Sequence, residues 1–179
     1  MSIPQVAIIG RPNVGNSSIL NWFAQARLAV VDDQAGVTRD RITHLLCHRE
    51  HYFEVVDTGG VGIEDVDNLT QEVEDQIALA IELASVILFV VDTQTGLLPL
   101  DQEVAKRLRY VKVPVVCVAN KTDHEGLDTE ADEFYRLGRG KLIRVSTKQN
   151  RGRDSLLDMI VERLPEILDA DAAPCPTRR

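Results

Sequence analysis

The sequence predicts a three-layer α/β fold, in which a six-stranded and mostly parallel sheet lies between two layers of helices. Short apolar runs alternate with longer amphipathic segments along the chain, as in repeated strand-helix-strand units. Glycine- and aspartate-containing turns follow several of the apolar runs. A turn just before His51 joins two strands directly and makes one of them antiparallel, whereas longer crossovers keep the remaining strands parallel.

The first strand and the first helix enclose a glycine-rich turn. Residues Pro4–Ile9 form a short apolar run that leads directly into Gly10, as expected for a buried strand. After the turn, Ile19, Leu20 and Phe23 have the spacing of one helical face. The order of strand, glycine turn and helix is therefore predicted at the start of the chain.

The later elements repeat this alternation. Residues His51–Val56 alternate between polar and apolar side chains and then become apolar, and Val113–Ala119 is apolar throughout. Both patterns predict a strand that ends at a polar turn. The expected strands span residues 4–9, 42–48, 51–57, 86–92, 113–119 and 141–145, and the expected helices span residues 17–26, 68–84, 100–110, 129–137 and 153–168.

Composition limits the kind of protein. A chain of 179 residues with 44% hydrophobic residues fits one domain, expected over residues 1–168, followed by a linker or tail at 169–179. No apolar run is long enough to cross a membrane. The formal net charge of −8 argues against binding nucleic acid over the whole surface, and no sequence-specific DNA binding is expected. Cys47, Cys117 and Cys175 lack a secreted-framework spacing, so we expect them to be unpaired in the cytoplasm.

Residues Gly10–Ser17 match the phosphate-loop pattern G-x-x-x-x-G-K-[ST], except that Asn16 takes the place of the lysine. In such loops, backbone N–H groups and the following helix N-terminus hold the phosphates, and the Ser17 hydroxyl would bind Mg²⁺. The missing lysine would have reached the β- and γ-phosphate oxygens. The alternative interpretation is an ordinary glycine turn, so other motifs must decide.

Two further motifs follow predicted strands. The sequence Asp57–Gly60 (Asp-Thr-Gly-Gly) begins with a carboxylate that can hold Mg²⁺, and its last glycine lets a backbone N–H approach a γ-phosphate. The sequence Asn120–Asp123 (Asn-Lys-Thr-Asp) ends in a carboxylate that can accept both donors of guanine, a pair that adenine lacks. Either motif alone could be a polar turn. Together with the phosphate loop, in this order and at strand ends, they favour guanine-nucleotide binding.

Beyond these motifs, residues 36–40, 57–60 and 90–101 resemble the first GTPase domain of the Der (EngA) family of bacterial ribosome-assembly GTPases. The resemblance extends over residues 4–168. It implies a Ras-like P-loop NTPase fold, hydrolysis of GTP to GDP and phosphate, Mg²⁺ as cofactor, and a large ribosomal subunit precursor as partner. A protein of this family would continue into a second GTPase domain.

The resemblance also implies roles for single residues. Ser17, Thr38 and Asp57 would hold the metal, Thr38 doing so only when the first switch loop closes over GTP, and the candidate catalytic residues are Asn13, Thr38 and Gly60. Lys121 would lie over the base, and Ser146 and Thr147 would offer backbone N–H groups to its O6 atom. The candidate nucleotide-binding residues are Gly10, Arg11, Pro12, Asn13, Val14, Gly15, Asn16, Ser17, Ser18, Asp57, Thr58, Gly59, Gly60, Val61, Asn120, Lys121, Thr122, Asp123, Ser146 and Thr147.

Three positions depart from the usual pattern. Val61 stands where many small GTPases carry a water-orienting glutamine, and valine cannot hydrogen-bond water, so intrinsic hydrolysis is expected to be slow. Relatives with this substitution often recruit K⁺ beside the phosphates, which implies that Asn13 helps to hold it. Thr147 replaces the usual alanine near the base, and Asn16 replaces the lysine.

The loss of the lysine bears on function. Charge-assisted hydrogen bonds contribute about 1.5–3 kcal/mol each, so their absence predicts roughly ten- to a hundredfold weaker phosphate binding. Asn16 is either an engineered loss-of-function substitution or a natural weakening of the site. Two functions therefore remain open: a GTP-hydrolysing switch, and a non-hydrolysing regulatory module that binds GTP or GDP.

Overall fold

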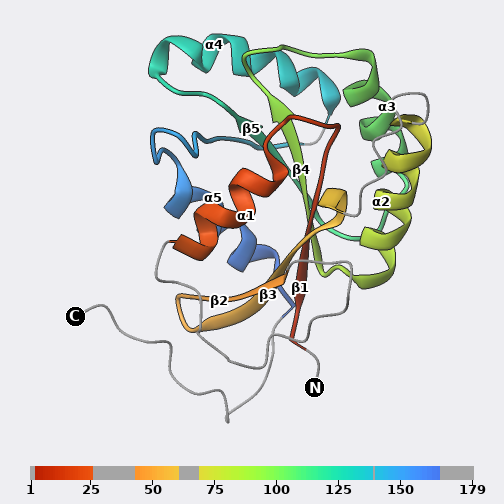
Figure 1. Cartoon of the computed structure of the whole chain (residues 1–179), viewed down its shortest axis with the longest axis vertical. Helices are drawn as coiled ribbons and strands as arrows, with labels where there is room; N and C mark the ends of the chain where they lie inside the picture. Colours follow the sequence, from red (N-terminus) through yellow and green to blue (C-terminus); the bar gives the residue numbers. More distant parts are fainter. Residues whose placement is uncertain (1–2, 26–42, 61–68, 139, 166–179) are drawn as a thin grey trace.

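The computed structural model describes residues 3–25, 43–60, 69–138 and 140–165 (Figure 1). Six strands form one sheet in the order β2-β3-β1-β4-β5-β6. The pair β2–β3 is antiparallel, and every other neighbouring pair is parallel. The predicted mixed sheet is therefore confirmed. The strands are β1 (Gln5–Ile9), β2 (Thr43–His48), β3 (His51–Asp57), β4 (Val86–Asp92), β5 (Val115–Asn120) and β6 (Leu142–Arg144).

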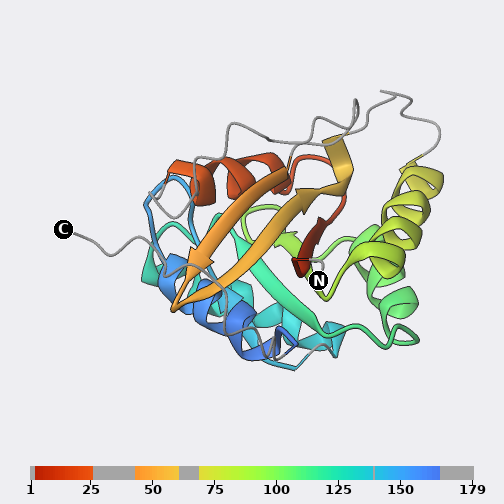
Figure 2. The same ribbon diagram turned by 90° about the horizontal axis from the view of Figure 1, so that it is seen from below.

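Helices cover both faces of the sheet, which gives three layers (Figure 2). On one face, side chains of α1 and α5 pack against the sheet; on the other, those of α2, α3, α4 and η5 do so. The α-helices are α1 (Asn16–Phe23), α2 (Leu69–Leu83), α3 (Pro99–Leu108), α4 (Asp128–Ala131) and α5 (Arg153–Arg163), and the 3₁₀ helices are η2 (Thr58–Gly60), η4 (Glu125–Leu127) and η5 (Asp132–Leu137).

Strand β4 lies in the middle of the sheet and is buried along its whole length. Its alternate side chains enter the two cores, so that Leu88 packs with the α1 and α5 layer and Phe89 packs with the α2 and α3 layer. A strand covered on both faces reads as a continuous apolar run. This explains why residues 86–92 carry almost no polar side chain before Asp92.

The helix predicted over residues 129–137 is wrong in type. Helix α4 is only four residues long, and η5 continues it as a 3₁₀ helix to the left-handed Gly138 (φ 68°). The buried side chains Ala131, Phe134 and Leu137 recur every third residue. A period of three matches the 3₁₀ helix, whose side chains at i and i+3 lie above one another.

Helix α5 ends earlier than predicted. The sequence predicts a helix to residue 168, whereas the helix ends at Arg163 and Leu164 has an extended conformation (φ −66°, ψ 146°). The next residue is Pro165, whose ring disfavours the helical conformation of the residue before it. The proline therefore fixes the end of the helix.

The structure also bears on the expectations for the cysteines and for membrane-spanning segments. Cys47 on β2 is disulfide-bonded, so the expectation that this cysteine is unpaired is wrong. Within the described residues, no helix is both long and apolar enough to cross a membrane. The predicted boundary at residue 168 and the tail at 169–179 lie outside the described residues, and the division into domains stays a prediction.

Candidate nucleotide-binding site

The phosphate loop connects β1 to α1 at the top of the view in Figure 1. Gly15 has a φ of 100°, and a Cβ added to it would lie only 2.3 Å from the Asn120 Nδ2 atom. Only glycine adopts this conformation without strain and leaves room for the amide. The Asn120 Nδ2 atom in turn donates to the Val14 carbonyl oxygen at 2.9 Å. The first residue of the Asn-Lys-Thr-Asp motif thus fixes the loop of the first motif.

A cavity of about 700 Å³ lies over this loop. Its walls come from the phosphate loop, from the end of β3, from α2 and from Lys121 after β5. Because β1, β3 and β5 are parallel, their carboxyl ends meet at one edge of the sheet, where α/β proteins bind ligands. The lining residues are Gly10, Arg11, Pro12, Asn13, Gly15, Asn16, Ser17, Ser18, Asp57, Gly59, Glu72, Gln76 and Lys121.

Ser17 and Asp57 meet inside this cavity. The Ser17 Oγ atom donates to the Asp57 Oδ2 atom at 2.9 Å, and the Gly59 N–H donates to Asp57 Oδ1 at 2.9 Å. Asp57 is almost completely buried. Within the described residues, no group of three or more acidic, histidine or cysteine side chains could bind a metal ion. A hydroxyl and one carboxylate fit Mg²⁺, which takes few protein ligands and completes its shell with waters and phosphate oxygens.

Asn16 is the first residue of α1, and its side chain lies between two glycines of the cavity wall. A Cβ on Gly10 would lie 3.1 Å from Asn16 Oδ1, and one on Gly59 would lie 3.5 Å from Asn16 Nδ2. The Oδ1 atom is buried and has no hydrogen-bond partner among the described residues. A buried polar atom without a partner is costly, so the described residues leave the Asn16 Oδ1 atom poorly satisfied.

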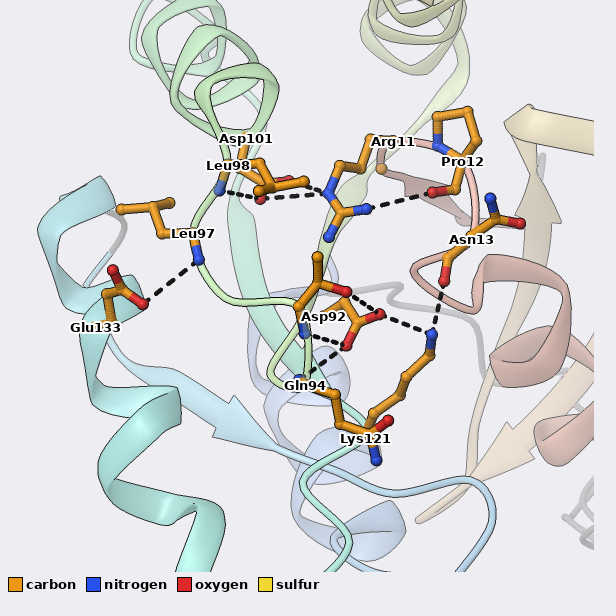
Figure 3. A network of polar contacts seen from close by, with 12 residues as sticks. Arg11, Pro12, Asn13, Asp92, Gln94, Leu97, Leu98, Asp101, Lys121 and Glu133 are labelled. Atoms are coloured by element: carbon orange, nitrogen blue, oxygen red, sulfur yellow. Dashed lines mark hydrogen bonds and ion pairs between the residues drawn. The ribbon is translucent and has the colours of Figure 1, made fainter.

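Arg11 connects the phosphate loop to α3 through a buried ion pair (Figure 3). Its Nε atom lies 3.2 Å from Asp101 Oδ1, and both residues are buried. The Leu98 N–H also donates to Asp101 Oδ2, at 3.0 Å. Burial raises the pKa of the Asp101 carboxyl above 3.8, although Leu98 and Arg11 oppose that shift. Arg11 is one of the nucleotide-binding residues expected from the sequence, but its side chain is paired with Asp101 on α3.

Lys121 forms the second link around the cavity. Its Nζ atom donates to the Asn13 carbonyl oxygen at 2.8 Å and to Asp92 Oδ2 at 2.7 Å (Figure 3). Burial would raise the pKa of the Asp92 carboxyl, but hydrogen bonds from Lys121 and Thr95 outweigh it and leave the pKa below 3.8. The lysine therefore holds the loops after β1, β4 and β5 together. The side chain of Asn13 is exposed.

Asp123 is held at the far side of the Asn-Lys-Thr-Asp motif. Its Oδ1 atom accepts the Ser146 hydroxyl at 2.6 Å, and its Oδ2 atom accepts the Gln94 amide at 3.0 Å. The Ser146 N–H donates to the Arg151 carbonyl oxygen at 3.0 Å. Of the two backbone groups expected to face the guanine O6 atom, the Ser146 N–H is thus already used, which leaves that of Thr147.

Other predicted residues have structural partners. The Thr58 hydroxyl donates to the Ile8 carbonyl oxygen, and the Thr122 hydroxyl donates to the Ala119 carbonyl oxygen. Thr38 and Val61 lie outside the described residues, so the roles expected for them stay predictions.

Four residues at or beside this site did not emerge as candidates from the sequence: Glu72 and Gln76 on α2, Asp92 at the end of β4 and Asp101 in α3. Asp92 follows an apolar strand in the same way as Asp57, and that position could have found it. Gln76 interrupts the apolar face of an amphipathic helix, which is a weaker signal.

The family model for 50S ribosome-binding GTPases matches residues 5–121, well over half of the chain. The chain belongs to the 50S ribosome-binding GTPase family. Among curated members, GTPase Der of Rhodopirellula baltica is 61% identical over 166 residues, and GTPase Der of Geobacter metallireducens is 45% identical over 164 residues. These matches cover 93% and 92% of this chain but only 37% of each relative, so the chain spans a little over a third of their length. The resemblance to Der is confirmed.

Solved structures of other GTPases share the fold. Era of Aquifex aeolicus, bound to GDP and AlF₄⁻, has a TM-score of 0.72 and 28% identity, covering 99% of this chain and 63% of its own. The G domain of the FeoB iron transporter of T. maritima has a TM-score of 0.64 and covers 90% of this chain, with 17% identity. At that identity, the likeness to FeoB shows the fold alone. The predicted Ras-like α/β fold is confirmed.

Proposed function

We propose that this chain is the guanine-nucleotide-binding domain of a GTPase that acts in the assembly of the large ribosomal subunit. One observation supports this most: the phosphate loop, Asp57 and Lys121 line one cavity at the carboxyl edge of the sheet. The curated relatives named above are Der GTPases. An Era structure that is 27% identical to this chain was solved with MgGDPNP and part of 16S ribosomal RNA.

The phosphates would lie over the loop between Gly10 and Ser17, where backbone N–H groups face the cavity at the start of α1. Ser17 and Asp57 would hold Mg²⁺, which would neutralise charge on the phosphates. Gly60 would offer its N–H to the γ-phosphate, because it follows Gly59 at the cavity wall. With Thr38 in the first switch loop, this arrangement would let the domain distinguish GTP from GDP.

The base would lie beyond Lys121, between the Asn-Lys-Thr-Asp motif and Thr147. The Asp123 carboxylate would accept the two guanine donors after exchanging its present hydrogen bond from Gln94 for them. Its bond from the buried Ser146 would stay and fix its orientation. A hydrogen-bonding site of this kind rejects bases that leave its polar atoms unpaired.

Hydrolysis to GDP and phosphate is expected to be slow, because Asn16 removes the lysine charge and Val61 cannot orient water. The exposed Asn13 side chain at the cavity rim supports a role for K⁺ beside the phosphates. The second candidate function, a regulatory module that binds GTP or GDP without turnover, is favoured by Asn16 alone. We place the domain in the cytoplasm, where ribosomes assemble.

The partner would be a precursor of the large ribosomal subunit, bound by the whole protein. Several basic side chains of this domain pair with acids of the same domain: Arg107 with Glu74, Arg144 with Asp132, and Arg151 with Asp128. These pairs lower the positive charge that they could offer to RNA. We therefore do not assign the RNA contact to those three arginines.

Nucleotide titration tests the base preference. The chain should bind GDP and GTP, ATP should not compete, and Asp123→Ala should lose most of the affinity for guanine nucleotides. Asp154→Ala, which removes an exposed carboxylate on α5, is the matched control and should bind as the unaltered chain does. Competition by ATP equal to that by GTP would refute the proposal.

Single-turnover GTP hydrolysis, measured in K⁺ and in Na⁺, separates the two candidate functions. Stimulation by K⁺ supports the GTP-hydrolysing enzyme, and tight GDP binding without turnover supports the regulatory module.

A further inference from the structure

Gln76 on α2 is a buried polar side chain in an apolar environment. It is 4% exposed, and it lies between Val73, Ile77 and Ala80, which pack into the core on the same helix. It also lines the cavity over the phosphate loop. Burying an amide is costly unless it forms hydrogen bonds. A glutamine at this point of an apolar helix face therefore indicates a hydrogen-bonding role at the cavity wall.

The contacts of Gln76 bring it to the same two glycines that Asn16 approaches. Its Oε1 atom accepts the Gly10 N–H in a long hydrogen bond of 3.5 Å. A Cβ on Gly59 would lie 3.4 Å from Gln76 Nε2 and 3.5 Å from Asn16 Nδ2. The side-chain amide nitrogens of Asn16 on α1 and Gln76 on α2 thus both lie beside Gly59. Gly59 immediately precedes Gly60, the proposed γ-phosphate contact.

We propose that Gln76 is a specificity-determining residue whose Nε2 atom donates to the terminal phosphate of GTP. With Asn16, it supplies neutral donors on the side of the cavity where the lysine of the G-x-x-x-x-G-K-[ST] pattern would act. The inference rests on the proposed function, because it assigns a further ligand within that site. Gln76 borders Gly10 and Gly59, not the base-binding loop after β5. Because Gly59 precedes the proposed γ-phosphate contact Gly60, we assign the Gln76 donor to the terminal phosphate, which GTP has and GDP lacks.

A purely structural role of Gln76 would lead to a different pattern of nucleotide affinities. If Gln76 only ties α2 to Gly10, its loss should weaken GDP and GTP equally and lower the stability of the fold. A ligand to the terminal phosphate should instead change the ratio of the two affinities. The ratio of the affinities for GTP and GDP therefore distinguishes the two roles.

The test compares Gln76→Leu with Gln102→Leu, which makes the same change at an exposed position on α3. Calorimetry measures the affinities of each variant for GDP and for a non-hydrolysable GTP analogue at a fixed Mg²⁺ concentration. We expect Gln76→Leu to weaken the GTP analogue about three- to tenfold, the range of one neutral hydrogen bond, with GDP affinity changed by less than about twofold. Gln102→Leu should change neither. If Gln76→Leu fails to fold, Gln76→Asn shortens the amide and should show the same selective loss.

A double variant tests whether Gln76 acts in the place of the lysine. In an Asn16→Lys background, the added ammonium should contact the terminal phosphate, and Gln76→Leu should then cost less than about twofold. An equal loss for both nucleotides, no loss for either, or the same loss in both backgrounds would overturn the inference. Failure of the unaltered chain to bind any guanine nucleotide would instead refute the proposed function.

Discussion

At the residue scale, Asn16 sets the chemistry of this site. The loop around it has the backbone of a phosphate loop, including the left-handed Gly15 and the hydroxyl of Ser17 beside Asp57. Among the described residues that line the cavity, no positive charge is free for the phosphates. The two basic residues that line the cavity are already paired, Arg11 with Asp101 and Lys121 with Asp92. From the described residues, we therefore expect the phosphates to be held by backbone N–H groups, neutral amides and metal ions.

Asn16→Lys should tighten the binding of GTP by about ten- to a hundredfold, because it restores charge-assisted hydrogen bonds to the β- and γ-phosphates. Fluorescence titration with labelled GTP measures the change. Ser18→Lys, which adds the same charge to the cavity wall two residues further along α1, is the control and should gain less. An unchanged affinity in Asn16→Lys would mean that this loop does not hold phosphates.

At the element scale, the first turn of α3 depends on a single buried carboxylate. Asp101 is completely buried, accepts the Leu98 N–H at the start of the helix and pairs with Arg11 of the phosphate loop. The loop is thereby attached to a helix that lies far from it in sequence. Nothing in the local pattern of residues 99–108 predicts this link, because an acid in the first helical turn is ordinary.

Asp101→Ala should destabilise the fold by about 3–5 kcal/mol, since it leaves the Arg11 guanidinium buried without its partner. Urea unfolding followed by circular dichroism gives the free energy of unfolding. Gln102→Ala, the next residue on the same helix and exposed, should change it by less than about 0.5 kcal/mol. A loss of similar size in both variants would show that the ion pair adds nothing beyond the helix itself.

At the scale of the whole molecule, three neighbouring loops are joined by one lysine. The Nζ atom of Lys121 connects the loop after β1 to Asp92 at the end of β4, while its own backbone continues from β5. The edge of the sheet is thus held as one unit. Its stability is coupled to pH through Asp92, whose carboxyl has a pKa below 3.8 in the folded protein.

Because that pKa is lowered, the unfolded chain takes up the proton first, and the contribution of Asp92 is present above pH 3.8 and lost as the pH falls through the folded value. The difference in unfolding free energy between the unaltered chain and Asp92→Asn should therefore shrink from about pH 5 to about pH 2. Thermal unfolding across this range measures it. Asp101→Asn is the contrast, because its raised pKa gives a contribution that falls as the pH rises above 3.8. A constant difference for Asp92→Asn would contradict the coupling.

Local sequence was enough to determine the strands, the order of the motifs and the position of the cavity. Period-two and period-3.6 patterns are local, and the carboxyl ends of parallel strands meet wherever such strands form. The type of helix at 128–137 and the end of α5 were misjudged, although a period of three and Pro165 were visible in the residues.

Only the tertiary structure decided which distant side chains share the site. Gln76, Asp92 and Asp101 come from three elements, and their roles depend on burial and on partners that no spacing rule relates to them. Burial depends on how the layers pack against one another. Because an unpaired polar group costs more free energy when it is buried, only a few pairings of the buried polar groups are stable. The backbone pattern therefore fixed where a nucleotide would lie, and packing fixed which groups are left to hold it.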